Sequence, residues 1–283
     1  MGDLDHDTRV EGADGHYSAT LDEDWNIWGP NGGYLGVVLL RAAGAHAELA
    51  RPASLGVQFL ARAEFGPVSL DVRTVRRTRR AEAVAVTMTQ GERAVATAQA
   101  WFVDVGLAGL DHQVAPVPDI PPADALRTWD QLRADYDIPR PTFRFWDNID
   151  YRPADFVEDW PPPGPLAPVS EGWFAFRPRA VFDDPLVDAG RSVVVLDTMT
   201  WNPASRPHAW KWDPESQPWV APSLDLHVRF HQFVPESAQL LVRAESPAGA
   251  GGLVTAEGRA WADDGTLLAS SGAQMLCTPV PPT

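Results

Sequence analysis

The chain has 283 residues, of which 45% are hydrophobic and 22% are charged, a composition typical of a soluble globular protein with one large or two medium cores. Its formal net charge of −15 argues against non-specific nucleic-acid binding, because clustered Lys and Arg hold a phosphate backbone. The acidic N-terminus lacks the basic and apolar regions of a signal peptide, and the single cysteine, Cys277, rules out an internal disulfide. We therefore expect a reduced, cytoplasmic compartment.

The first predicted element is a helix over residues 32–47 that is apolar on every side. It follows a glycine-rich turn in the run WNIWGPNGGYLGVVLLRAAG, residues 25–44. A surface helix has one apolar stripe, so a helix without a polar face must be surrounded by protein. Arg41 and His46 interrupt the run before it reaches the roughly 20 apolar residues of a membrane span, so none is expected.

Three strand-like stretches follow this helix, at residues 54–63, 67–77 and 82–103, and the last is broken by a QGE turn. A proline-rich connection with a short amphipathic piece around residues 126–132 then extends to Pro141.

The same order then begins again in the second half. Strands are predicted at residues 143–153 and 172–179, a buried helix at 193–202 stopped by Pro203, and further strands at 223–231, 238–246 and 252–277, the last with a DDG turn.

These two halves indicate an internal duplication. VQF at 57–59 aligns with VRF at 228–230, and GERAVAT at 91–97 aligns with GTLLAS at 265–270 after a shift of two residues. An antiparallel sheet that curls around a central helix would bury that helix on all sides. We predict an α+β fold of two tandem repeats, at residues 1–108 and 142–283, joined by the connection at 109–141.

Several stretches in this order resemble the double-hotdog acyl-CoA thioesterases of the TesB-like, thioesterase-like superfamily. They are NGGYLGVVLLRAA, VQFLARAEFGPV and VTMTQGERAVATAQAWF in the first half, and SLDLHVRFH and DDGTLLASSGAQML in the second. The resemblance covers both halves. It implies a double hotdog fold, hydrolysis of an acyl thioester carried by coenzyme A or a carrier, and a place in fatty acid metabolism.

The resemblance also implies three catalytic residues. In that family an Asp on the second hotdog helix, a Thr or Ser before the next strand and a Gln on the last strand hold the catalytic water; the first two match Asp197 and Ser223. Asp197 stands out without the resemblance, because a carboxylate inside VVVLDTMTW is expected to be buried, where an unpaired charge is costly. A structural Asp that bonds a backbone turn is the alternative, and Ser223 alone would be taken for a turn residue.

The third position departs from the family pattern. The family Gln aligns with Ala273, whereas Gln274 is one residue later, and a slip of one residue turns a strand side chain to the opposite face. A β-bulge at Ser271 and Gly272 would restore its direction. Without the bulge, the site lacks one ligand for the water.

Other catalytic patterns are absent from the sequence. His227 and His231 would lie about 13 Å apart in a strand and have no CxxC partner, so we predict no metal. We find no GxSxG elbow, GxGxxG loop or Walker loop, and we predict no cofactor. Cys277 is expected to pack as a small hydrophobe.

Three features are candidates for substrate binding. The basic run RTVRRTRR, which includes Arg76 and Arg77, is either a phosphate or acidic-carrier site or a solvated hairpin. The tryptophan-rich insertion at 201–219 is predicted to cover an acyl pocket with Trp201 and Trp210; alternatively it seals a subunit contact in a homo-oligomer.

The third feature is the start of the first helix, where Gly32, Gly33 and Tyr34 are expected to contact substrate. The turn before them brings free backbone N–H groups for an oxyanion or a phosphate, although close packing also explains the glycines.

Two functions therefore remain open. The leading hypothesis is a thioesterase in which Asp197 orients water; the alternative is a non-catalytic acyl-thioester or lipid-binding protein, which the register of Gln274 favours. A hotdog hydratase would need an Asp and a His together, and no such pair occurs at motif spacing.

Overall fold

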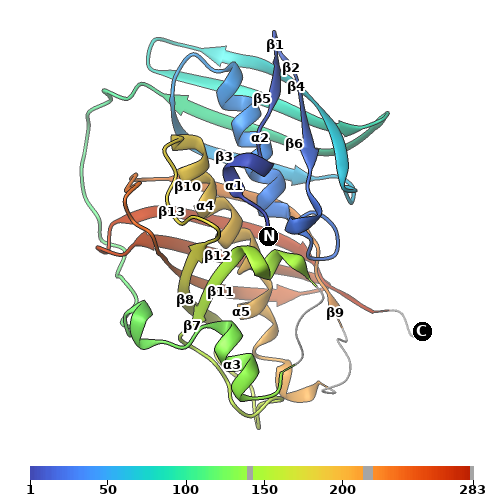
Figure 1. Cartoon of the computed structure of the whole chain (residues 1–283), viewed down its shortest axis with the longest axis vertical. Coiled ribbons are helices and arrows are strands. Elements are labelled where there is room, and N and C mark those ends of the chain that lie inside the picture. Colours follow the sequence, from blue (N-terminus) through green and yellow to red (C-terminus); the bar gives the residue numbers. More distant parts are fainter. Residues whose placement is uncertain (139–142, 213–218, 281–283) are drawn as a thin grey trace.

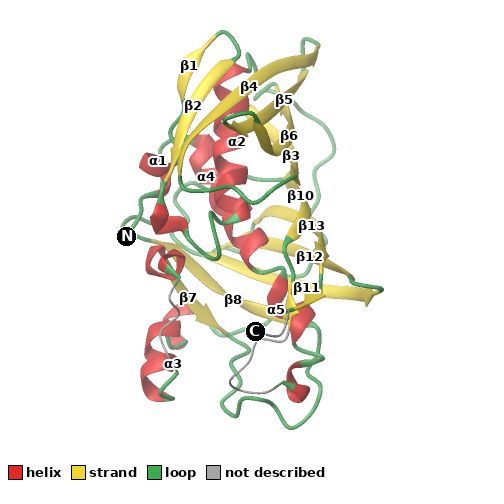
Figure 2. Cartoon of the chain, turned by 90° about the vertical axis from the view of Figure 1, so that its right-hand side faces the viewer, coloured by secondary structure: helices red, strands yellow, loops and turns green. Residues whose placement is uncertain are grey.

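The computed structural model describes residues 1–138, 143–212 and 219–280. Two halves of the chain lie one above the other, and each wraps a sheet around one long helix (Figures 1 and 2). In the described residues the strands form one sheet of 12 strands and a separate small pair, β9 with β14, and every pairing is antiparallel. The predicted continuous antiparallel surface around two central helices is thus present.

The large sheet has the order β1-β2-β4-β5-β6-β3-β10-β13-β12-β11-β8-β7. Read from its centre, where β3 pairs with β10, the order of the first half repeats in the second. The strands are β1 (Glu11–Ala13), β2 (His16–Leu21), β3 (Arg51–Phe59), β4 (Gly66–Arg77), β5 (Ala81–Gln90), β6 (Arg93–Val103), β7 (Ile149–Pro153), β8 (Val169–Phe176), β9 (Trp219–Val220), β10 (Ser223–Phe230), β11 (Leu240–Ala250), β12 (Leu253–Ala262), β13 (Leu267–Leu276) and β14 (Thr278–Pro279).

Seven short helices lie before and between these strands in the described residues. They are α1 (Leu4–Asp7), η1 (Glu23–Trp25), η2 (Ala123–Ala125), α3 (Trp129–Asp135), η3 (Arg144–Asn148), α5 (Trp201–Ser205) and η4 (Ala209–Lys211). The two long central helices are α2 (Gly32–His46) and α4 (Pro185–Thr198).

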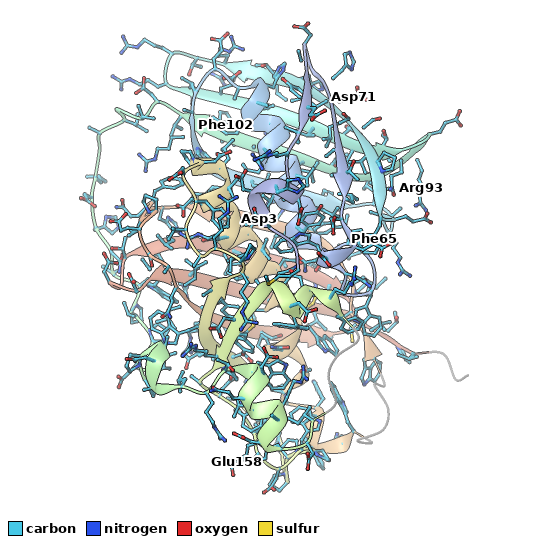
Figure 3. The ribbon with its side chains drawn as sticks, in the orientation of Figure 1. Asp3, Phe65, Asp71, Arg93, Phe102 and Glu158 are labelled. Carbon is cyan, nitrogen blue, oxygen red and sulfur yellow. The ribbon has the colours of Figure 1, made fainter. Side chains whose placement is uncertain are left out.

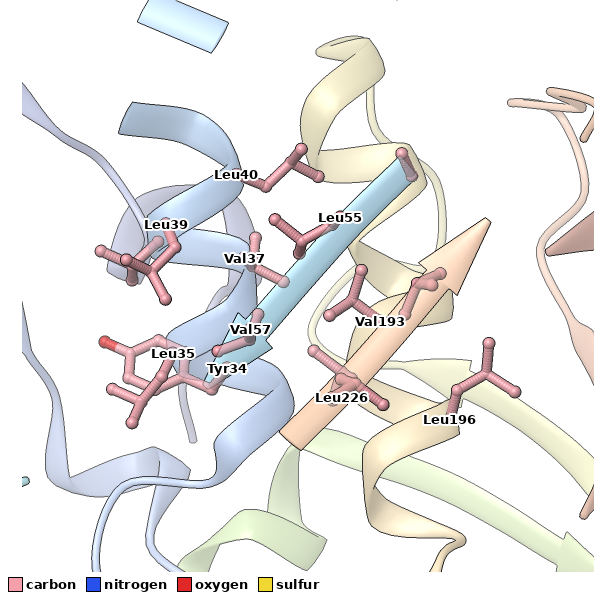
Figure 4. Close-up of a cluster of buried hydrophobic side chains, with 14 of the residues drawn as sticks. Tyr34, Leu35, Val37, Leu39, Leu40, Leu55, Val57, Val193, Leu196 and Leu226 are labelled. Carbon is pink, nitrogen blue, oxygen red and sulfur yellow. The ribbon is translucent and has the colours of Figure 1, made fainter. Parts of the chain in front are cut away.

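The predicted first helix is confirmed as α2, and its apolar surroundings are as expected. Asn31 caps it, and ten of its residues are buried, from Gly33 through Ala43 with the exception of Arg41. Figure 4 shows Val37 and Leu40 of α2 close to Leu55 of β3 and Val193 of α4. A helix that is enclosed by the sheet on one side and by a second helix on the other needs no polar face.

The second helix starts earlier and ends earlier than predicted. Asp184 caps α4, whose Pro185 occupies the first turn, where proline costs no hydrogen bond. Residues 201–202 belong to the separate helix α5, and Pro203 lies within its first turn rather than stopping α4. Residues 143–148 are also not a strand, because Arg144–Asn148 form the 3-10 helix η3 before β7 begins.

Glycines let α2 and α4 pack against each other in antiparallel directions. A Cβ on Gly33 would lie 2.6 Å from the Cα of Val194, and a Cβ on Gly190 would lie 2.8 Å from Cγ1 of Val37. At Gly33 the backbone of α4 occupies the space that a side chain would need, and at Gly190 the Val37 side chain of α2 occupies it. As a result, the N-terminus of α2 meets the C-terminal turn of α4.

The part of the connection around residues 113–126 packs on the outer face of the second half of the sheet. There Ala123 packs with Trp173, Leu241 and Trp261, and the Trp173 indole donates to the Pro121 carbonyl at 3.0 Å. The connection therefore covers an apolar strip that the sheet leaves on its outside.

We expect Gly33→Ala to destabilise the fold although alanine favours a helix by about 1 kcal/mol over glycine. The new Cβ meets backbone atoms of α4, which cannot rotate away, and such overpacking costs roughly 1–3 kcal/mol. Urea denaturation measures the change. Gly164→Ala is the matched control, since nothing lies within 4 Å of its Cβ position. Equal stability of both variants would contradict the close helix contact.

Candidate active site

Asp197 lies in the last turn of α4 and faces the N-terminus of α2 from the other half of the chain. Only 7% of the residue is exposed. Its Oδ2 accepts a hydrogen bond from the Gly33 N–H at 2.8 Å and from Nδ2 of Asn31 at 3.2 Å. The carboxylate therefore has one oxygen held by two donors, while the other, Oδ1, faces Ser223.

Burial raises the pKa of Asp197 from its ordinary 3.8 to about 6. Three hydrogen bonds lower this pKa, from the Gly33 N–H, the Ser223 hydroxyl and the Asn31 amide, but their combined effect is smaller than that of burial. No charged side chain contributes, so the helix terminus and two polar groups alone favour the ionised form. Asp197 is thus poised to titrate close to neutral pH.

Ser223 begins β10, and its Oγ lies 3.5 Å from Oδ1 of Asp197. A bulge at Leu224 determines its direction, because Ser223 pairs with Met275 while Asp225 pairs with Gln274. The extra residue reverses the alternation of the strand, so that Ser223 lies on the side of buried Met275 and Leu224 is exposed. The structure therefore brings Asp197 and Ser223 together.

Gln274 is not brought to this site. Pairing of β13 with β10 and β12 is continuous through Ser271 and Gly272, so the bulge that would have restored the direction of Gln274 is absent. Ala273 faces the core, where it pairs with buried Leu226, and Gln274 therefore points to the opposite face. Its Oε1 accepts a hydrogen bond from Oγ1 of Thr255 at 3.3 Å.

Asn31 is a site residue that the sequence analysis missed. Its Oδ1 caps α2 by accepting from the Tyr34 N–H at 2.9 Å, while its Nδ2 reaches Asp197. An Asn before two glycines does indicate a helix cap. Nothing in the sequence relates it to a carboxylate 166 residues later.

The two glycines at the start of α2 have different roles. A Cβ on Gly32 would lie 2.9 Å from Oδ2 of Asp197 and 3.0 Å from the Phe59 ring, so only glycine leaves this space open. The Gly33 N–H donates to Asp197, so it is not free to bind a ligand. Among the described residues the Gly32 N–H has no hydrogen-bond partner, and it remains available to a ligand.

Tyr34 was predicted to contact substrate, and the structure instead gives it a structural position. Its hydroxyl donates to the Asp7 carbonyl at 2.7 Å and accepts from the Asp22 N–H at 3.1 Å, and its ring stacks on Trp25. Burial raises the pKa of this phenol above its ordinary 10. Tyr34 therefore fixes the N-terminal segment against α2.

The tryptophan-rich insertion is only partly described, since residues 213–218 lie outside the described residues. Trp201 is half-buried and stacks on Trp212, with ring centroids 6.2 Å apart, and Trp212 also meets Trp160. Trp210 is 42% exposed, and the Lys211 ammonium lies over its ring in a cation–π contact. Trp201, four residues after Asp197, is thus the better placed of the two predicted pocket residues.

Arg76 and Arg77 lie far from Asp197. Arg77 pairs with Glu48, just beyond the C-terminus of α2, and with Glu82. The 15 residues of α2, at about 1.5 Å per residue, separate its two ends by roughly 20 Å. The basic run therefore does not belong to the Asp197 site.

The opposite end of the helix pair holds no equivalent carboxylate. There the C-terminal turn of α2 presents Gly44 to the side chain of Leu186 in α4, at the position where Asp197 meets Gly33 at the other end. The described residues thus contain one such site in two repeats.

The described residues contain no cluster of three or more side chains that could bind a metal ion. They also include no helix long and apolar enough to cross a membrane.

His231 hydrogen-bonds Ser270 at 2.9 Å, and burial raises the pKa of Cys277. A hollow of about 810 Å³ lies on the outer face of the sheet, where Gln99 and His227 are among its lining residues. Asp197 is not among them, because it lies on the inner, helix-facing side.

Comparisons with known proteins match both halves of the chain. The N-terminal domain of acyl-CoA thioesterases matches residues 21–103, and the C-terminal domain of acyl-CoA thioesterases matches residues 112–276. A search of curated proteins gave no significant match.

Solved structures share the fold over the whole chain. A hot dog fold protein from Alicyclobacillus acidocaldarius superposes with a TM-score of 0.80 at 21% identity, covering 99% of this chain and 98% of that one. An acyl-CoA thioesterase II from Mycobacterium marinum has a TM-score of 0.78 at 20% identity and 99% coverage of each chain. A tesB protein from Mycobacterium avium subspecies paratuberculosis has a TM-score of 0.74 at 20% identity and 98% coverage of each. The predicted double hotdog fold is confirmed.

We expect Asp197→Asn to stabilise the protein at pH 7.5 but not at pH 4. A pKa raised from 3.8 to about 6 means that the folded state holds its proton more tightly than the unfolded chain. The contribution of Asp197 to the free energy of unfolding is therefore fully present below pH 4 and is lost as pH rises through 6. The loss is on the order of 3 kcal/mol.

The amide removes this cost, because no partner charge is left unpaired in the variant. Urea denaturation of both proteins across pH 4–8 tests it. A variant that is less stable than the wild type at pH 7.5 would show that Asp197 is a structural group.

Proposed function

The chain belongs to the acyl-CoA thioesterase family and is a thioester hydrolase, and from that premise we propose that it hydrolyses an acyl-CoA with a water molecule that Asp197 orients and deprotonates. The observation that carries this proposal is the arrangement of the buried carboxylate. Two donors hold its Oδ2, its Oδ1 faces the Ser223 hydroxyl, and no charged group neutralises it. Such a carboxylate can accept a proton near neutral pH.

In the first step a water between Oδ1 of Asp197 and the Ser223 hydroxyl attacks the thioester carbonyl carbon. The water oxygen forms the new C–O bond as its proton passes to Oδ1, and the carbonyl π electrons move onto the oxygen. The Gly32 N–H at the positive end of α2 is a suitable donor to this oxyanion.

The second step expels the thiol. The C–S bond breaks as the carbonyl re-forms, and the departing sulfur takes the proton from Asp197. The products are a carboxylic acid and a free thiol, and the Asp197 carboxylate is regenerated. One group thus serves first as base and then as acid, which suits a pKa of about 6.

The second function that the sequence leaves open is a non-catalytic acyl-thioester or lipid-binding protein, and the family match over both halves of the chain argues against it. The outward direction of Gln274 favours it, because the site then has one polar ligand fewer for the water than the family pattern. A buried carboxylate with a raised pKa favours catalysis instead, since simple binding of an apolar chain gains nothing from it.

We expect Asp197→Asn to lower kcat for acyl-CoA hydrolysis by roughly 10² or more, because the amide cannot accept the proton. Ser223→Ala should lower it less, by up to about tenfold, the scale of one lost hydrogen bond. Gln274→Ala is the control and should leave kcat unchanged. Thiol release from acyl-CoA, with binding followed separately, measures all three. A wild-type rate in Asp197→Asn would end the proposed mechanism.

The pH dependence of kcat/KM should show an acidic limb with its midpoint near 6, because protonated Asp197 cannot act as base. Loss of the Ser223 hydroxyl removes a bond that favours the ionised form, so Ser223→Ala should move this midpoint to higher pH. An acidic limb that is identical in both proteins would argue that another group titrates.

A further inference from the structure

The turn before α2 carries an exposed aromatic ring a few residues from the buried carboxylate. Both the Trp28 and Gly29 N–H groups donate to Oδ1 of Asn26, at 3.1 and 2.9 Å. One side of the Trp28 ring meets Phe143, with centroids 5.6 Å apart, yet Trp28 stays 48% exposed. The turn therefore presents an indole surface to solvent.

An arginine that has no acidic partner among the described residues lies across the same turn. A Cβ on Gly29 would be 3.0 Å from Nε of Arg62, so the guanidinium passes directly over this glycine. Among the described residues Arg62 forms no ion pair, even with Glu64 two residues later. Arg93, which lies at one edge of the molecule in Figure 3, donates to the Arg62 carbonyl at 2.9 Å and adds positive charge.

The chain itself leads from this turn to the site. Gly32 meets the Asp197 carboxylate and lies three residues after Gly29, a separation of at most about 11 Å. Exposure falls along the same path from Trp28 to Asp197. The turn is therefore within reach of a ligand whose reactive end is at Asp197 and whose other end is in solvent.

An aromatic face and a free guanidinium are the groups that recognise a nucleotide. Purine bases stack on exposed indole rings, and arginine forms charge-assisted hydrogen bonds with phosphates. In coenzyme A the pantetheine arm separates the thioester from the adenine nucleotide, so a nucleotide subsite belongs near the reaction site rather than at it. The predicted alternative, Arg76 and Arg77, lies at the far end of α2.

We propose that Trp28 and Arg62 form the subsite for the adenine nucleotide of an acyl-CoA, with Trp28 against the base and Arg62 on the phosphates. This inference rests on the proposed function and makes it more specific. An acyl group on a carrier protein has no adenine, so the chain should prefer coenzyme A esters.

The test compares one acyl group on coenzyme A and on pantetheine, which keeps the thioester but lacks the nucleotide. Trp28→Leu and Arg62→Gln should each raise KM for the acyl-CoA by roughly tenfold, the scale of one stacked base or one charge-assisted hydrogen bond. KM for the acyl-pantetheine should not change. Arg79→Gln, the same substitution in the remote basic run, is the matched control and should behave as the wild type.

Equal losses on both substrates would overturn the proposal, because these residues would then act on the site or the fold. Unchanged KM for the acyl-CoA would also overturn it. A wild-type protein that hydrolyses neither ester would instead refute the proposed function. Calorimetry with coenzyme A itself then still decides the subsite: weaker binding to Arg62→Gln than to Arg79→Gln supports it, and equal binding rejects it.

Discussion

The close antiparallel contact of α2 and α4 is the constraint on which the rest of the structure depends. Gly33 and Gly190 let each helix approach the other until backbone and side chain touch. Neither helix then needs a polar face, so one sheet can enclose both. The contact also brings the positive end of α2 against the last turn of α4, and a side chain at that turn is buried between two helix ends. Asp197 occupies that position.

The electrostatics of this position explain why a carboxylate is kept there at a cost. A negative charge in the last turn of α4 is repelled by that helix's own dipole, whereas the start of α2 attracts it. The Gly33 N–H and the Asn31 amide complete this attraction with direct hydrogen bonds. Burial still dominates, and the pKa settles at about 6. The protein therefore holds a group that is mostly ionised at neutral pH yet remains basic enough to take a proton, and stability is lower for it.

The sequence predicted the parts of the fold that depend on local pattern. Strand alternation and the all-apolar run located most strands and α2, and the repeated order indicated the double hotdog. The start of α4 was missed because Asp188 and Arg191 look like surface residues, although they pair with each other inside the core. Pro203 predicts the end of a helix, yet a proline is tolerated in a first helical turn such as that of α5.

The candidate site was predictable only where one residue carried the signal. A carboxylate in an apolar helix identifies Asp197 by itself. Ser223 reaches it through a bulge at Leu224, where the sequence has no glycine, whereas the bulge at Ser271 and Gly272 that would have turned Gln274 toward the site does not form. Asn31 depends on a contact between the two repeats that no local pattern encodes.

The site is built from residues of both repeats, and for this reason the described part of the duplicated fold contains a single site. The first repeat supplies the donors, Asn31 and the start of α2, and the second supplies Asp197 and Ser223. At the other end of the helix pair Gly44 and Leu186 fill the same space with apolar contact. Nearby, buried Glu82 is fully occupied by the Glu48 N–H, Thr74 and Arg77. At one end of the helix pair the two helices thus meet through apolar contact, and at the other end they enclose a carboxylate that no charged group neutralises. Either repeat alone would leave Asp197 without its donors or the donors without Asp197, so the chemistry requires both halves in one chain.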